Sequence, residues 1–164
     1  MPDQAGTHLR PVSVGDLPAI DGWAATVADG ALSRTRPLAP DADRHDPGSG
    51  LFWFVIVADG REVGTIWIER LGQSYEGRLG VFLGDPADLG HGIGQAAVRL
   101  AVAEYQAVHP GEPISLHVRS SNALAIGCYR AVGFEVVGSG VKKSSSGDSI
   151  PFHTMVLSSD IAQT

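Results

Sequence analysis

A glycine-rich segment, Leu-Gly-His-Gly-Ile-Gly at residues 89–94, lies between a strand-like run and a helix-like run. The apolar run 79–83 precedes it, and the alanine-rich run 95–108 follows with apolar residues at helical spacing. Alternating glycines leave the backbone bare where a helix begins, so several N–H groups point at one place and the helix macrodipole adds partial positive charge. The segment therefore predicts a strand–turn–helix unit that binds an anion such as phosphate or pyrophosphate.

This segment matches neither of two common nucleotide-binding motifs. A phosphate-binding Walker loop needs Lys-Ser/Thr after the last glycine, but Gln95 and Ala96 follow Gly94. A dinucleotide-binding motif that starts at Gly90 needs glycine at position 95. On its own the segment therefore leaves open a turn that only lets a helix pack closely on a strand.

A second motif follows the alternating run 114–118. Asn122 is a good N-cap, Gly133 stands where a left-handed C-cap residue belongs, and apolar residues between them recur at helical spacing. Asn122 and Tyr129 are seven residues apart, which brings them to nearly the same side of the expected helix. We therefore expect Tyr129 to face the same region as Asn122.

Together the two segments resemble those of the GNAT superfamily of N-acetyltransferases. In that family a Gln/Arg-x-x-Gly-x-Gly/Ala loop binds the coenzyme A pyrophosphate, and a later Asn-x-x-Ala-x-x-x-Tyr-x-x-x-Gly-Phe segment carries a tyrosine near the thioester sulfur. Residues 89–94 and 122–134 match these patterns in the expected order. Residues 82–86 resemble the branch that acetylates ribosomal-protein N-termini, polyamines or aminoglycosides. The resemblance covers roughly residues 7–158 and implies a mixed α/β fold, with a mostly antiparallel sheet of about seven strands and about four helices.

The resemblance implies transfer of acetyl from acetyl-CoA, as cosubstrate, to a primary amine of a small molecule or a protein N-terminus, by direct attack in a ternary complex. It assigns coenzyme binding to Phe82, Leu83, Leu89, Gly90, His91, Gly92, Ile93, Gly94, Gln95, Asn122 and Tyr129. Backbone N–H groups from Phe82 through Gly84 are expected to polarise the thioester carbonyl. Tyr129 is the expected general acid, since a phenol is protonated at neutral pH.

Two positions depart from the family pattern. Leu89 stands where relatives usually have glutamine or arginine, and Arg78 stands where many carry a glutamate base. The remaining candidates for the general base are Glu76, Glu69 and His117. Alternatively, a water chain takes the amine proton, and both glutamates are ordinary solvated surface residues. The departures leave two other functions open: a GNAT-fold enzyme using a longer acyl-CoA, a carrier-protein thioester or an aminoacyl-tRNA, and a coenzyme-binding module without turnover.

Composition predicts a single domain over residues 1–164, with its core at about 7–158. The formal net charge of −6 argues against a nucleic-acid partner and favours a cationic amine acceptor. One cysteine and six histidines without ligand spacing predict no metal. No apolar run is long enough for a membrane helix and no signal peptide is evident at the N-terminus, so we expect a cytoplasmic protein without membrane contact. A homodimer is left open.

The rest of the chain predicts a series of shorter elements. We expect strands at 9–12, 52–58, 62–70, 135–138 and 153–157, and helices beginning at 16–20 and running over 24–33. Residues 35–50 read as a mobile loop over the acceptor site, and residues 142–147 as a flexible polar tip. Trp53 and Trp67 lie on adjacent expected strands, where they line a cleft or pack in the core.

Overall fold

Seven strands form one sheet in the computed structural model, which describes residues 6–26, 35–39, 41–71, 75–143 and 146–158. The strand order is β1-β2-β3-β4-β5-β7-β6, and every neighbouring pair is antiparallel except the parallel pair β4–β5. The strands are β1 (Thr7–Pro11), β2 (Leu51–Ala58), β3 (Arg61–Arg70), β4 (Gly77–Leu83), β5 (Ile114–Arg119), β6 (Glu135–Lys143) and β7 (Ser149–Leu157). The expected mixed α/β fold with a mostly antiparallel seven-stranded sheet is confirmed.

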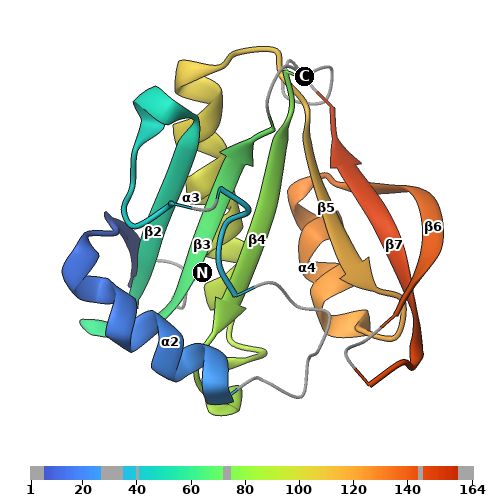
Figure 1. Cartoon of the computed structure of the whole chain (residues 1–164), viewed down its shortest axis with the longest axis horizontal. Coiled ribbons are helices and arrows are strands. Elements are labelled where there is room, and N and C mark those ends of the chain that lie inside the picture. Colours follow the sequence, from blue (N-terminus) through green and yellow to red (C-terminus); the bar gives the residue numbers. More distant parts are fainter. Residues whose placement is uncertain (1–5, 27–34, 40, 72–74, 144–145, 159–164) are drawn as a thin grey trace.

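Helices cover both faces of this sheet (Figure 1). α3 (Ile93–Val108) and α4 (Ala123–Val132) lie on one face, and α2 (Leu17–Thr26) crosses the other. Apolar residues of α3 and α4 pack in the larger core with β2, β3, β4, β5 and β7. Ile20 of α2 packs in a second core with Trp53 and Trp67 of the hairpin. The central strands are therefore buried on both sides.

The hairpin of β2 and β3 is specified by its turn and by apolar residues on both faces. Asp59 and Gly60 have φ angles of 50° and 80°, the left-handed pair that a two-residue hairpin turn requires. All eight residues of β2 are buried, because alternate side chains enter the two cores. Within the smaller core, the indole N–H of Trp53 donates to Thr65 Oγ1 at 2.9 Å. Trp53 is thus a core residue.

β4 and β5 are paired only where they begin. Gly77 pairs with Ile114 and Arg78 with Ser115, and the pairing ends there. Beyond this point β4 remains paired with β3, while β5 runs beside β7 along its whole length. Figure 1 shows β4 and β5 meeting at one end and separating toward the other, with α4 behind the gap. The sheet is therefore open between its two halves.

Two expected helix and strand boundaries are wrong. A separate helix does not begin at residue 24, because residues 24–26 complete α2; the rest of the expected helix, 27–34, lies outside the described residues. The described part of the chain has three α-helices. β6 does not end at residue 138 but continues to Lys143, since Lys142 pairs with Ile150 of β7. Lys142 therefore belongs to a strand and not to a flexible tip.

The segment 35–50 is attached to the sheet at several points. The N–H groups of Leu38 and Ala39 each donate to the carboxylate of Glu69 at 2.6 Å. His45 Nδ1 accepts from the N–H of Trp53 at 2.9 Å. These contacts place residues 38 and 39 beside the end of β3, and the mobility of the segment stays a prediction.

Candidate active site

The glycine segment forms an open backbone turn at the amino end of α3. Gly90 and Gly92 have φ angles of 81° and 82°, which glycine adopts without strain. A Cβ atom added at Gly90 would meet no other atom within 4 Å, so the space above it is open. The N–H of Ala96 donates to the Gly92 carbonyl, and the N–H groups of residues 93–95 before it are directed out of the helix end. This geometry suits a backbone anion site.

The side chains around this turn differ in exposure. Leu89 and His91 are exposed, and Gln95 is half-buried in the first turn of α3. Ile93 is buried in the larger core, so it can offer a ligand only its backbone. Gly94 lies against α4, because a Cβ atom added there would be 4.0 Å from Cys128 Sγ. The turn therefore borders both α3 and α4.

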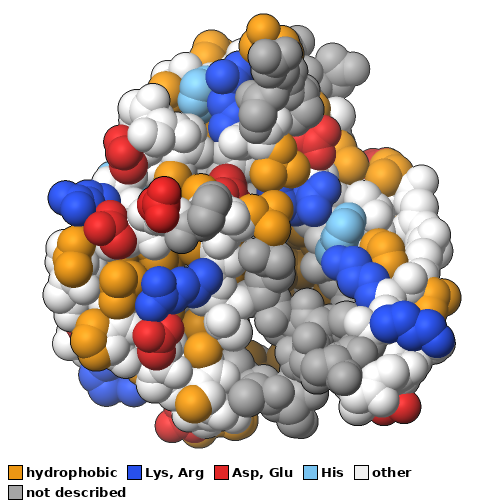
Figure 2. Space-filling view, in the orientation of Figure 1, with side chains coloured by type: hydrophobic (Ala, Val, Ile, Leu, Met, Phe, Trp, Pro, Cys, Tyr) orange, Lys and Arg blue, Asp and Glu red, His pale blue; other side chains and the backbone are white. Residues whose placement is uncertain are grey.

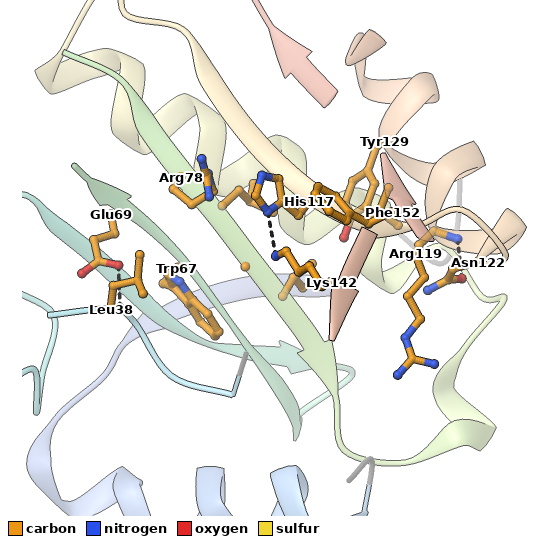
Figure 3. Close-up of a pocket in the computed structure, with 15 residues that line it drawn as sticks. Leu38, Trp67, Glu69, Arg78, His117, Arg119, Asn122, Tyr129, Lys142 and Phe152 are labelled. Carbon is orange, nitrogen blue, oxygen red and sulfur yellow. Dashed lines mark hydrogen bonds between the residues drawn. The ribbon is translucent and has the colours of Figure 1, made fainter. Parts of the chain in front are cut away.

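One face of α4 carries three residues at helical spacing toward the gap in the sheet. Asn122 Oδ1 accepts from the N–H of Ala125 at 3.2 Å, which confirms the expected N-cap. Asn122, Ala125 and Tyr129 all line one cavity (Figure 3). The seven-residue spacing thus brings Asn122 and Tyr129 to the same site.

This cavity has a volume of about 300 Å³ and occupies the opening between β4 and β5. Trp67 and Glu69 of β3 line one side and His117 of β5 another. Leu38 from the segment 35–50 lines it as well. The volume is at the lower end of the range of small-molecule sites. Of the residues that sequence analysis proposed for catalysis, the cavity brings together Tyr129, Glu69 and His117, and Glu76 does not line it.

Tyr129 is largely buried between the core and the cavity. Its ring packs edge-on against Phe134, with 6.0 Å between ring centroids. Burial, with a smaller contribution from Cys128, raises the pKa of Tyr129 well above its ordinary value. The phenol therefore stays protonated at neutral pH. Burial also raises the pKa of Cys128 to about 11, so this thiol is not a thiolate nucleophile at neutral pH.

His117 is held as a neutral imidazole beside two cations. Lys142 Nζ lies 2.9 Å from His117 Nδ1, and since an ammonium can only donate, Nδ1 is the acceptor. Burial, followed by the positive charges of Lys142 and Arg78, lowers the pKa of His117 to about 4. The Phe152 ring lies 4.8 Å from the His117 ring and also 4.8 Å from Lys142 Nζ. A lone pair that already accepts from a lysine is a weak base for an incoming amine.

The two candidate glutamates are both engaged in hydrogen bonds. Glu69 is 6% exposed and accepts from the backbone of the segment 35–50 at both carboxylate oxygens. Glu76 Oε2 accepts from the hydroxyl of Ser115 at 2.5 Å, and Ser115 Oγ accepts from Arg78 Nε at 2.9 Å. Glu69 therefore serves as an attachment point for a cavity-lining segment, and Glu76 reaches the cavity through Ser115 and Arg78.

The backbone of β4 presents alternate N–H groups to its two neighbours. The N–H of Gly84 donates to Val63 of β3 at 2.8 Å, and the N–H of Gly77 donates to Pro113, just before β5, at 3.0 Å. Successive residues of a strand direct their peptide groups to opposite sides. Even-numbered residues of β4 therefore face β3, and odd-numbered residues face β5.

This alternation changes which backbone group can reach a ligand in the gap. The N–H of Phe82 is directed to β3, whereas the N–H groups of Val81 and Leu83 are directed toward the open side. Val81 also lines the cavity. The side chain of Phe82 packs beside the smaller core. Of the three positions expected to polarise a carbonyl, only Leu83 has an N–H in the required direction, because those of Phe82 and Gly84 are directed to β3. Val81, which was not expected, also directs its N–H to the open side.

Sequence analysis missed several residues that line the cavity. Arg119 shares a face of β5 with Ser115 and His117, and the alternation of this strand with its buried apolar residues could have identified it. Lys142 and Phe152 reach the cavity from β6 and β7, and their register depends on long-range pairing that no local pattern reveals.

An open sheet with a glycine turn at its mouth and a protonated tyrosine in its gap is typical of an acyltransferase that binds a nucleotide-bearing thioester. A family model described as the acetyltransferase (GNAT) family matches residues 22–134, more than half of the chain. The protein belongs to the GNAT family and is an acetyltransferase.

Solved structures with the same fold come from several bacteria. A spermidine N-acetyltransferase from Vibrio cholerae in complex with CoA and spermine has a TM-score of 0.79, with 17% identity over 98% of this chain and 99% of that chain. The putative acetyltransferase yncA from Salmonella typhimurium with acetyl-CoA has a TM-score of 0.72, with 19% identity over 94% and 95%. Mycobacterium smegmatis RimJ in complex with CoA-disulfide has a TM-score of 0.73, with 19% identity over 99% and 87%. At these identities the likeness shows the fold.

No curated protein sequence matches the chain. None of the helices in the described ranges combines the length and the apolar character that crossing a membrane requires.

Proposed function

We propose that this acetyltransferase uses acetyl-CoA as donor and acetylates a primary amine of a small molecule or protein N-terminus by direct attack in a ternary complex. The observation that carries the proposal is the gap between β4 and β5. The gap widens along β4 toward the glycine turn that follows this strand, and it holds the cavity that Tyr129 lines. In this proposal the phosphate-bearing donor follows the path from the glycine turn to the cavity, and the amine acceptor binds in the cavity.

The coenzyme fits this path by its chemistry. The N–H groups of residues 93–95 and the open surface above Gly90 suit a pyrophosphate. The odd-numbered peptide groups of β4 provide hydrogen-bond partners along the gap, as an amide-containing arm requires. When bound, acetyl-CoA supplies the activated acetyl group. Neighbours of the same fold were crystallised with CoA or acetyl-CoA, which supports the donor.

Two groups of the chain act on the reacting atoms in this proposal. The N–H of Val81, with that of Leu83, stabilises negative charge on the carbonyl oxygen. Tyr129 donates a hydrogen bond to the departing sulfur and supplies its proton, because burial keeps the phenol protonated. Glu69 is hydrogen-bonded at both oxygens, His117 Nδ1 accepts from Lys142, and Glu76 does not line the cavity. In this proposal the amine proton therefore leaves through water. No side-chain nucleophile takes part.

Calorimetry with coenzyme A and mass spectrometry of reaction mixtures test the proposal. The expected results are saturable coenzyme binding and a product heavier than the amine by one acetyl group. The panel contains amino acids, polyamines, aminoglycosides and peptides. Coenzyme binding without an acetylated product from any amine would contradict the proposed function, as would the absence of coenzyme binding.

A further inference from the structure

The cavity has a positive lining although the chain as a whole is acidic. Arg78, Arg119 and Lys142 line it, and Glu69 is the only carboxylate among the described lining residues. The chain has a formal net charge of −6. Figure 2 shows Lys and Arg side chains beside the hollow between the two halves of the sheet. The local charge is thus opposite to the overall charge that favoured a cationic acceptor.

The single carboxylate of the described lining forms no ion pair with Arg78 or Arg119. Both oxygens of Glu69 accept from the N–H groups of Leu38 and Ala39 at 2.6 Å. Among the described residues, no carboxylate lies within ion-pair distance of Arg78 or Arg119. Two guanidinium groups therefore face a cavity without a charged partner.

Arg78 is oriented by one hydrogen bond that leaves its amino groups available. Its Nε donates to Ser115 Oγ at 2.9 Å, and the Ser115 hydroxyl donates to Glu76 Oε2. Glu76 thus balances part of the charge from outside the cavity through a serine. The two terminal amino groups of Arg78 have no hydrogen bond to any other described residue. Such a pair of amino groups can bind a carboxylate in a bidentate way, through two parallel hydrogen bonds.

Arg78 and Lys142 converge on the same part of the cavity. Lys142 Nζ is 2.9 Å from His117, and the charges of both cations lower the pKa of that imidazole. The imidazole is neutral and so adds no charge of its own to this part of the cavity. Figure 3 shows Arg119 apart from this pair, near Asn122. Phe152 lines the same cavity and is half-buried, so it offers apolar surface, whereas Trp67 borders the cavity with only 2% of its surface exposed.

We propose that the amine acceptor carries an anionic group, a carboxylate in the simplest case, which binds Arg78 and Lys142 while its apolar part packs against Phe152. Amino acids have this chemistry. This inference rests on the proposed function and names the acceptor class of the same site. A polycationic amine would bring like charges to Arg78 and Lys142, which opposes its binding.

The wild-type enzyme tests the acceptor class directly. Standard amino acids, their amides and the corresponding decarboxylated amines form matched sets that differ only in the carboxylate, with spermidine as a polycationic comparison. We expect kcat/KM for the best amino acid to exceed that for its amide by at least about tenfold, since a charged hydrogen bond contributes more than a neutral one. Equal or better turnover of amides, simple amines or spermidine would overturn the inference and leave acetyl transfer intact.

Two variants locate the anion site. Arg78→Gln is expected to lower kcat/KM for the amino acid by about 10- to 100-fold, mainly through KM, and to change that for the amide by less than about threefold. Lys142→Met is expected to act in the same direction. Arg61→Gln is the matched control, because Arg61 pairs with Asp88 at the surface and does not line the cavity. It should leave the preference unchanged.

The same kinetics separate the acceptor from the coenzyme as the source of the negative charge. If Arg78→Gln raises KM for acetyl-CoA and leaves the acceptor preference unchanged, Arg78 binds a coenzyme phosphate and the inference is wrong. If circular dichroism shows that Arg78→Gln is unfolded, the comparison of amino acids, amides and amines with the wild-type enzyme decides the inference. Failure of every amine with coenzyme bound contradicts the proposed function and this inference together.

Discussion

Replacing Glu69 with glutamine separates attachment of the segment 35–50 from proton transfer. The carboxylate is 6% exposed and accepts from the N–H groups of Leu38 and Ala39 at 2.6 Å. Glutamine keeps the shape but has one acceptor oxygen, so one of the two N–H groups faces an amide donor. If Glu69 holds the segment, Glu69→Gln destabilises the fold; if it is the general base, the variant chiefly loses rate.

The magnitude follows from the two bonds. Hydrogen bonds to a charged group contribute about 1.5–3 kcal/mol each, and glutamine retains one neutral bond of about 1 kcal/mol. Relief of the desolvation of a buried carboxylate offsets part of the loss. We expect a net decrease of about 2–3 kcal/mol in the free energy of unfolding, or roughly 4–12 °C in Tm for a chain of this size.

Urea unfolding followed by tryptophan fluorescence measures the effect. Glu62→Gln is the matched control on the same strand, since Glu62 forms an exposed ion pair with Arg10, and its expected cost is below about 0.5 kcal/mol. Stability of Glu69→Gln within about 0.5 kcal/mol of wild type, combined with a loss of about 100-fold or more in kcat, would refute the attachment argument and identify Glu69 as the base.

Three further predictions concern the coenzyme turn, Tyr129 and His117. Gly90→Ala should weaken coenzyme binding about tenfold in calorimetry, whereas Gly60→Ala, with the same positive φ and open space, should share its backbone cost of about 1 kcal/mol and leave binding unchanged. Tyr129→Phe should lower kcat about 100-fold or more with coenzyme affinity retained, and an unchanged kcat would exclude Tyr129 as the acid. Because the pKa of His117 is lowered to about 4, the unfolded chain binds more protons between about pH 6.5 and 4. Wild type should therefore lose stability over that window as pH falls, and His117→Gln should lose less in the same denaturation series.

Local signals in the sequence predicted the parts of the site that lie on single elements. Gly90 and Gly92 adopt the left-handed backbone that an open turn needs, and Asn122 caps α4 two turns before Tyr129. Both patterns depend on neighbours within a few residues, so helical spacing and turn chemistry were enough to find them. The fold class followed from the family resemblance that these two segments carry.

The charges of the cavity could not be predicted in this way. Lys142 reaches His117 because β6 and β7 remain paired to Lys143 and because the register shifts between Val136 and Gly138. A one-residue change of register would turn the lysine to the other face of the sheet. Arg78 was recognised only as a missing glutamate. The orientation of the Arg78 guanidinium toward the cavity depends on its hydrogen bond to Ser115 on the neighbouring strand.

The opening that holds the site follows from how two helices cover one face of the sheet. α3 and α4 are in contact, with Arg99 on α3 donating to the carbonyl of Ala131 on α4 at 2.9 Å. α3 packs against β1, β2, β3 and β4, and α4 lies behind the gap beyond them (Figure 1). β4 and β5 thus diverge over the place where the two helices lie side by side. Tyr129 of α4 packs in the larger core and also lines the cavity in the gap. Truncating it to alanine would add a core defect of about 3–5 kcal/mol to any catalytic effect. Phenylalanine, which keeps the ring and removes only the hydroxyl, is therefore the substitution that isolates the chemistry.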